Sequence, residues 1–172
     1  GEVIMTTRFA PDFTQVSAGM KVFPRGEYEL TVTKVKPIAY FKKDEDGEPT
    51  DVFVSGCQVN VEMIGRLLND GSLDRTDEGE SVVPLRLYVH NEKGWGMTKS
   101  AIMAILGYTR DEEASFNGDQ GDADFSVDGE GDEATLGSSW DKLTGQHFIV
   151  TLDKRLYKGR EQQDTGSLSP VK

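Results

Sequence analysis

Residues 26–36 read GEYELTVTKVK, an alternation of apolar and polar side chains. Tyr28, Leu30 and Val32 fall on one side of an extended chain, and Glu29, Thr31 and Thr33 fall on the other. A period of two with β-branched residues predicts a half-buried β-strand. We expect this strand to begin after Pro24-Arg25-Gly26, to be interrupted by Pro37, and to resume over residues 38–41.

Three further stretches show the same alternation. Residues 51–63 alternate with a change of phase at Ser55-Gly56, which predicts a strand with a glycine bulge. Residues 81–90 and 146–152 predict two more strands, and residues 155–170 predict a turn at Lys158-Gly159 followed by a last strand. The Asp, Gly and Pro residues of 42–49 are typical of a hairpin connection.

The period changes after residue 94. Apolar residues from Trp95 to Leu106 recur at helical spacing and predict a helix over 97–106, with Thr98 or Gly96 as its cap and Gly107 just beyond its end. Residues 111–138 are rich in Gly and Asp and predict a flexible acidic insert without regular structure. A helical turn is expected over 139–143.

The chain is therefore expected to be mainly β, with five strands and one helix between strands three and four. That order is typical of the five-stranded OB-type barrel. An SH3-like barrel or an α+β sandwich would give similar strand counts. The expected organisation is an N-terminal extension at 1–23 and an OB-fold domain at 24–172, interrupted by the insert.

The net charge of −11 comes entirely from one segment. Residues 111–141 contain eleven carboxylates and no Lys or Arg, whereas the remaining residues hold 19 acids and 19 bases. Residues 142–172 carry six bases and three acids. The average charge therefore does not exclude binding of nucleic acid by the rest of the chain.

The enzymatic and metal-binding motifs considered for this sequence are absent or incomplete. No phosphate-binding P-loop occurs, and Gly94-Trp95-Gly96 is not a dinucleotide fingerprint. Asp122 and Asp124 begin like an EF-hand loop, but the glycine is missing. Cys57 lies among inward-facing valines and is expected to be a buried small hydrophobe. We therefore expect no enzyme, no cofactor and no metal site; the absence of a long apolar run predicts no membrane span.

Three clusters mix aromatic rings with cations, at the end of strand one, on strand three and in the last hairpin. Rings offer stacking platforms for bases and cations contact phosphates, while an OB barrel binds on strands two and three and on the loops that flank them. The expected nucleic-acid-binding residues are Tyr40, Phe41, Lys42, Lys43, Arg86, Tyr88, Lys154, Arg155, Tyr157, Lys158 and Arg160.

The chain resembles phage-encoded single-stranded DNA-binding proteins of the OB type. The resemblance rests on the order of short motifs: Pro11-Asp12-Phe13-Thr14-Gln15-Val16, then Phe23 to Leu30 with its Pro-x-Gly-x-Tyr, Ala104 to Tyr108, Leu143 to Val150, and Tyr157 to Arg160. It implies sequence-nonspecific binding of single-stranded DNA in phage replication, recombination or repair, in the host cytoplasm. The acidic segment, which many such proteins carry at the C-terminus, is internal here.

Other functions stay open at this point. A protein-interaction module would use residues 111–141 to bind a basic partner, and in the DNA-binding interpretation the same segment is expected to recruit phage or host replication and recombination proteins. A structural virion component and an enzyme are further alternatives.

Overall fold

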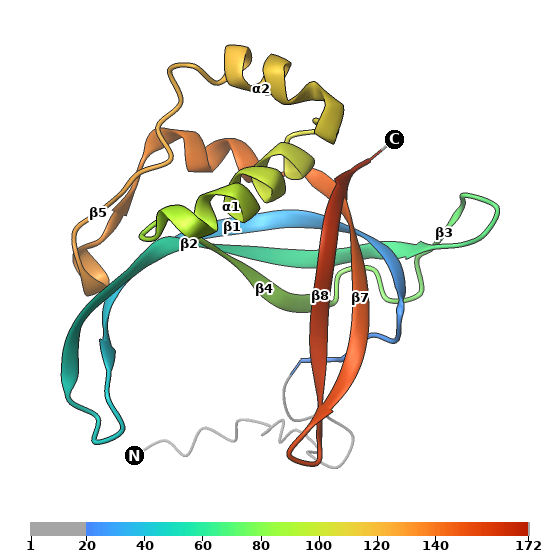
Figure 1. Cartoon of the computed structure of the whole chain (residues 1–172). Helices are drawn as coiled ribbons and strands as arrows, with labels where there is room; N and C mark the ends of the chain where they lie inside the picture. The colour runs from blue at the N-terminus through green and yellow to red at the C-terminus, as the bar shows by residue number, and fades with distance from the viewer. Residues whose placement is uncertain (1–19, 172) are drawn as a thin grey trace, which may run out of the picture.

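The structure is a computed structural model, and it describes residues 20–171. The predicted extension at 1–23 and the Pro11 to Val16 motif lie largely or wholly outside the described residues. The described chain is mainly antiparallel β-sheet with helices on one side (Figure 1). The elements follow in the order β1 (Gly26–Lys43), β2 (Pro49–Leu67), β3 (Leu73–Asp74), β4 (Ser81–Tyr88), α1 (Glu92–Ile105), η2 (Arg110–Glu112), α2 (Glu113–Asp119), β5 (Val127–Asp128), η3 (Gly131–Glu133), β6 (Thr135–Leu136), η4 (Ser138–Leu143), β7 (His147–Tyr157) and β8 (Arg160–Pro170).

The long strands are ordered β4-β2-β1-β7-β8, and each neighbouring pair in this order is antiparallel. Within residues 20–171, β4 pairs with β2 and not with β8, so the sheet is not closed. The expectation of a mainly β chain is confirmed, whereas the five-stranded OB-type barrel is not confirmed. A groove of about 970 Å³ lies between α1 and β8, lined by residues such as Ala101, Ala104, Leu168 and Pro170.

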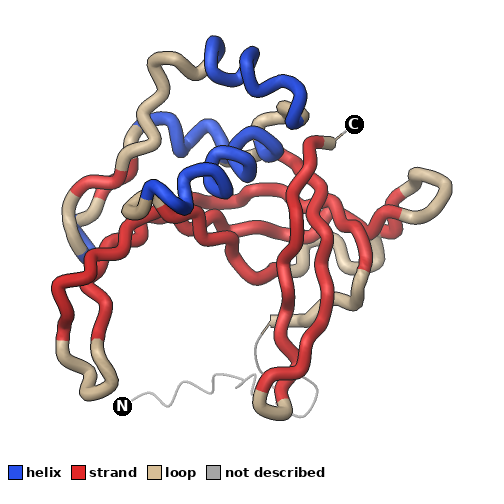
Figure 2. The backbone as a smooth tube through the Cα atoms, viewed as in Figure 1, coloured by secondary structure: helices blue, strands red, loops and turns tan. Residues whose placement is uncertain are grey.

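Strands β1 and β2 are longer than their patterns predicted. Only residues 26–31 of β1 pair with β7, whereas the pairing with β2 runs on to the end of β1. Pro37 lies inside β1, opposite Cys57. It does not interrupt the strand, because β1 has only one neighbour there and an edge segment tolerates the missing N–H. The result is a two-stranded hairpin that extends beyond the sheet (Figure 2).

The glycine bulge expected at Gly56 is also wrong. The β1–β2 register is regular from Tyr40↔Val54 to Lys34↔Asn60, and the irregularity lies instead between Val32 and Lys34. Gly56 is required for a different reason: a Cβ there would lie 2.4 Å from the carbonyl oxygen of Leu87 on β4. The pattern changes phase because Val54 and Cys57 are buried on opposite faces.

The core lies between the sheet on one side and α1 and η4 on the other. Leu30, Val59 and Phe148 of the sheet are almost fully buried, as are Ile105 of α1 and Trp140 of η4. Helix α1 starts earlier than predicted, because the Asn91 side chain accepts a hydrogen bond from the Lys93 N–H, 3.0 Å away. Neither Thr98 nor Gly96 is the cap.

Two predictions at chain reversals are confirmed. Gly107 follows Leu106, the C-cap of α1, with φ of 93°, a conformation that glycine adopts without strain. Lys158 and Gly159 both have positive φ and form the two-residue turn between β7 and β8. The Pro24-x-Gly26-x-Tyr28 motif also has a physical basis, because the Tyr28 hydroxyl donates to the Pro24 carbonyl at 2.7 Å.

The acidic insert contains regular structure, contrary to the prediction for residues 111–138. It forms η2, α2, η3 and the paired strands β5 and β6. The Trp140 ring, fully buried, meets the ring of Phe125 edge-on at 5.0 Å, and its Nε1–H donates to the Ser126 carbonyl. The Asp124 N–H donates to the Ser139 hydroxyl at 2.7 Å. A few apolar anchors thus fold a segment whose composition suggested disorder.

Replacing Trp140 by Ala should lower the free energy of unfolding by about 3–5 kcal/mol, because it leaves a large cavity and frees the Ser126 carbonyl. Urea unfolding followed by circular dichroism measures this. The half-exposed Trp95 provides the control, since Trp95→Phe should cost about 1 kcal/mol or less. Equal losses for the two variants would contradict the central role of Trp140.

Candidate nucleic-acid interface

The sheet face turned away from α1 carries three of the eleven candidate residues, Tyr40, Arg86 and Tyr88. Neighbouring residues in an antiparallel register share a face, so Lys36, Gln58 and Arg86 form one row across β1, β2 and β4. Asn60 pairs with Lys34 in the next row, and Gly56 lies between Ile38 and Tyr88 in the row on the other side. Core residues such as Val59 point the opposite way. We call the face formed by Lys34, Lys36, Ile38, Tyr40, Gly56, Gln58, Asn60, Arg86 and Tyr88 the outer face.

The cations of the outer face are exposed and free of acidic partners. Lys34, Lys36 and Arg86 make no ion pair with any residue between 20 and 171. The rows that they occupy contain no carboxylate, and the amides of Gln58 and Asn60 hydrogen-bond to each other at 2.9 Å. Three positive charges therefore remain available to an anionic ligand.

Two predicted aromatic residues belong to this face. Tyr40 is 48% exposed, and Tyr88 is half-buried with its ring edge-on to His90 at 5.6 Å. Both have ring surface that a base could cover.

Phe41 does not join them. Adjacent residues of a strand point to opposite faces, and the Phe41 ring packs against Phe53 at 5.0 Å on the other side of the hairpin. The structure therefore separates Phe41 from Tyr40, although the sequence grouped them.

The tip of the β1–β2 hairpin is acidic rather than basic. Lys42 and Lys43 lie near its end, where Asp44, Glu45 and Asp46 follow directly. Glu48, just before β2, and Asp51, on β2, add two more negative charges. Local cancellation makes this tip a poor phosphate site.

The β7–β8 hairpin borders the outer face on its other side (Figure 1). Its cations are partly neutralised: Lys154 lies 3.8 Å from Glu161, and Arg155 lies 3.4 Å from Asp164. Tyr157 is 53% exposed, with the Lys158 ammonium 5.4 Å from its ring centre. Arg160 pairs with Tyr157 across the turn. Tyr157, Lys158 and Arg160 are thus together and exposed at the tip.

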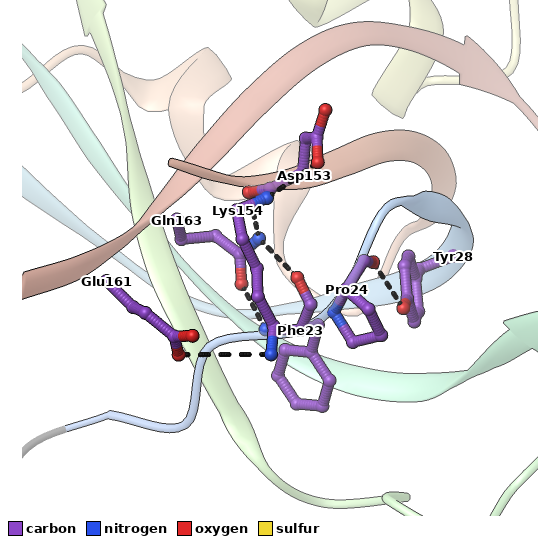
Figure 3. A network of polar contacts seen from close by, with 7 residues as sticks. All are labelled: Phe23, Pro24, Tyr28, Asp153, Lys154, Glu161 and Gln163. Carbon is purple, nitrogen blue, oxygen red and sulfur yellow. Dashed lines mark hydrogen bonds and ion pairs between the residues drawn. The ribbon is translucent and has the colours of Figure 1, made fainter. Parts of the chain in front are cut away.

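Gln163 fixes the position of this hairpin (Figure 3). Its side-chain oxygen accepts from the Phe23 N–H at 2.7 Å, and its side-chain nitrogen donates to the carbonyls of Phe23 and Asp153. Lys154 and Glu161 flank the same contact, on the side of Phe23. The hairpin is therefore attached to the segment that leads into β1.

The sequence did not identify Lys34, Lys36, Gln58 and Asn60 as candidate residues. Lys34 and Lys36 have the same parity as the core residues Leu30 and Val32, which would place them inside. The register shift between Val32 and Lys34 reverses the faces, so that Val35 packs against the core. The charge of Lys34 and Lys36, which disfavours burial, was the signal in the sequence that these two positions face outward.

The described residues do not assemble a metal site or a membrane-spanning helix. Within 20–171, no group of three or more His, Cys, Asp and Glu side chains is arranged to hold a metal ion. No helix in that range has the length and hydropathy to cross a bilayer. His90 contacts the Ser55 backbone, and His147 lies 2.9 Å from Glu29.

No known family model matches the chain, and none of the curated proteins matches its sequence.

Cys57 is fully buried, as its sequence context predicted. Burial raises the pKa of its thiol to about 12, because the thiolate would lose its hydration. At pH 8 the group is therefore protonated as well as inaccessible.

A thiol reagent such as 5,5′-dithiobis(2-nitrobenzoate) should leave the folded protein unlabelled at pH 8 and modify about one thiol per chain in denaturant, since Cys57 is the only cysteine. Absorbance of the released thionitrobenzoate measures the reaction. Rapid labelling of the folded protein would show that the β2 strand around Cys57 is open to solvent.

Proposed function

We propose that the protein binds single-stranded DNA on the outer face, between the two hairpins, without strong sequence preference. One observation carries the proposal: three cations without an ion-pair partner in residues 20–171 and two tyrosines lie on one face, in adjacent rows that contain no carboxylate, and Glu62 follows only in the row beyond Asn60. The strand order β4-β2-β1-β7-β8 and the helix between β4 and β7 support an OB-type arrangement with an open seam.

Cationic and aromatic side chains would make two different kinds of contact with the DNA. Lys34, Lys36 and Arg86 contact phosphates, and the unpaired bases of a single strand stack on Tyr40 and Tyr88. Neighbouring strands lie about 4.8 Å apart, so the row from Lys36 to Arg86 spans about 10 Å and can contact successive parts of one strand. Tyr157, Lys158 and Arg160 extend the surface at the β7–β8 tip.

The distribution of charge favours the same location. The eleven carboxylates of 111–141 belong to a segment that packs on the α1 side, through contacts such as Phe116 and Trp140 in the core. Exposed charges beyond about 8 Å are largely screened at physiological salt. The local charge of the outer face, rather than the net charge of −11, therefore governs the approach of DNA.

The cellular role that we propose is phage DNA replication, recombination or repair. It rests on the motif order shared with phage single-stranded DNA-binding proteins. Stacking and phosphate contacts need no cofactor and no catalytic group, so the proposed activity is binding alone.

Removing the central cations should weaken DNA binding and reduce its salt dependence. For Lys34→Ala, Lys36→Ala and Arg86→Ala, each lost phosphate contact should lower the slope of log K against log salt by about 0.7, equivalent to about fivefold in affinity near 0.1 M salt. Anisotropy of a labelled oligo-dT strand at several salt concentrations measures both quantities. Lys142→Ala, on η4 at the α1 side of the sheet, is the control. A loss for Lys142→Ala as large as for Lys36→Ala would contradict this location.

Tyr40 and Phe41 provide a matched test of the stacking face. Tyr40→Ala should weaken oligo-dT binding by about 1–3 kcal/mol, because a platform for one base is lost. Phe41→Ala should leave DNA affinity within about twofold, because its ring lies against Phe53 on the opposite face. Titration of both variants with oligo-dT decides between the outer face and the other face of the hairpin.

A further inference from the structure

A second hollow lies between α1 and the acidic insert, on the opposite side of the sheet from the outer face. Its volume is about 550 Å³, within the range of ligand pockets. We call it the insert pocket. It is lined by Ser55, Val89, Trp95, Thr98, Lys99, Ile102, Phe116, Gln120, Ala123, Phe125, Ser126 and Val127.

The walls of the insert pocket are mainly apolar and are held in place by packing. Phe116 and Ile102 are buried, and Phe125 is fixed edge-on against Trp140. At the rim, Trp95 is 51% exposed, but its Nε1–H donates to the Val89 carbonyl at 2.7 Å and holds the ring in position. An exposed indole beside a preformed apolar hollow is typical of a surface that takes a large side chain from a partner.

The only charged residue of the lining is already neutralised. The Lys99 ammonium lies 2.9 Å from the Glu113 carboxylate and 6.0 Å from the Phe116 ring centre. It therefore adds little positive charge to the insert pocket.

Carboxylates follow the pocket lining along the chain. Asp119 precedes the lining residue Gln120, Asp122 and Asp124 flank Ala123, and Asp128 follows Val127. Asp119 accepts a hydrogen bond from Tyr108, and Asp124 accepts one from the Ser126 N–H. The side chains of Asp122 and Asp128 are exposed, and they make no hydrogen bond or ion pair within residues 20–171. Asp128 follows the lining residue Val127 on β5 and therefore points to the other side of that strand, whereas Asp122 adjoins the lining residue Ala123 in a turn and leaves one negative charge for a ligand.

We propose that the insert pocket binds a segment of a partner polypeptide in which one large apolar side chain stands between Lys or Arg residues. The apolar side chain would enter the hollow between α1 and α2, and a flanking cation would meet Asp122. The same carboxylate repels the phosphates of nucleic acid. This surface does not depend on DNA binding by the outer face, because the sheet and its core separate the two.

The probe is a fluorescein-labelled peptide, Lys-Lys-Ser-Phe-Ser-Lys-Lys, titrated with the full chain and followed by anisotropy. Its matched control is Lys-Lys-Ser-Ser-Ser-Lys-Lys, which keeps the charge and removes the ring. Burial of a phenylalanine side chain should make the first peptide bind at least about tenfold more tightly. Equal affinity of the two peptides would overturn the proposal.

Two variants test the location. Ala123→Phe fills the pocket and should abolish the difference between the peptides, with circular dichroism confirming the fold. Asp122→Asn should weaken both peptides by up to about fivefold and reduce the salt dependence. Asp128→Asn removes the same charge from the other side of β5 and should change nothing; an equal loss there would overturn the proposal.

One more variant separates this surface from the outer face. The peptide itself binds oligo-dT through its lysines, so a variant of the outer face is used in place of DNA as a competitor. Lys36→Ala combined with Arg86→Ala should leave the affinity of the phenylalanine peptide unchanged, whether or not DNA binds the outer face. A loss of peptide affinity in this variant as large as in Asp122→Asn would place the peptide on the outer face and overturn the proposal.

Discussion

Antiparallel pairing along β1 is the interaction on which the rest of the structure depends. The first part of β1 is hydrogen-bonded to β2 on one edge and to β7 on the other, which joins the two halves of the sheet. At Val32 the second neighbour ends: the Val32 carbonyl accepts from the Gly145 N–H at 2.8 Å, and β7 begins just beyond. From there β1 pairs with β2 alone, while β2 stays paired with β4 as far as Gly56, opposite Ile38; beyond that point β1 and β2 continue as a two-stranded hairpin. A single strand thus supports the core, the outer face and one border of that face.

The register shift between Val32 and Lys34 gives β1 two different roles along its length. Before the shift, alternate residues from Tyr28 to Val32 fill the core, and after it Val35 takes the inward position. Without the extra residue, Lys34 and Lys36 would point into the apolar core, where an unpaired ammonium is strongly unfavourable. The bulge therefore lets one strand contribute apolar residues to the core and cations to the outer face.

The helices and the insert divide the surface into two parts of opposite character. Trp140 and Phe116 bring an acidic segment onto the α1 side, where it forms a pocket with α1. The outer face keeps Lys34, Lys36 and Arg86 in rows that contain no carboxylate. A net charge of −11 is therefore compatible with an anionic ligand on one face and a cationic partner on the other, because exposed charges act over short distances in salt.

The alternation of 26–36, 81–90 and 146–152 was sufficient to predict the main strands, since a half-buried strand leaves a period of two in its sequence. Gly107 and Lys158-Gly159 marked chain reversals correctly, because positive φ is a local requirement. The exposed tyrosines at positions 40 and 157 were likewise recognisable from local composition. Local patterns could not show that Phe41 faces Phe53, that Lys34 and Lys36 turn outward, or that the insert folds around Trp140. Each of these depends on a partner distant in sequence, and pairing register and packing are decided only when the chain brings that partner into contact.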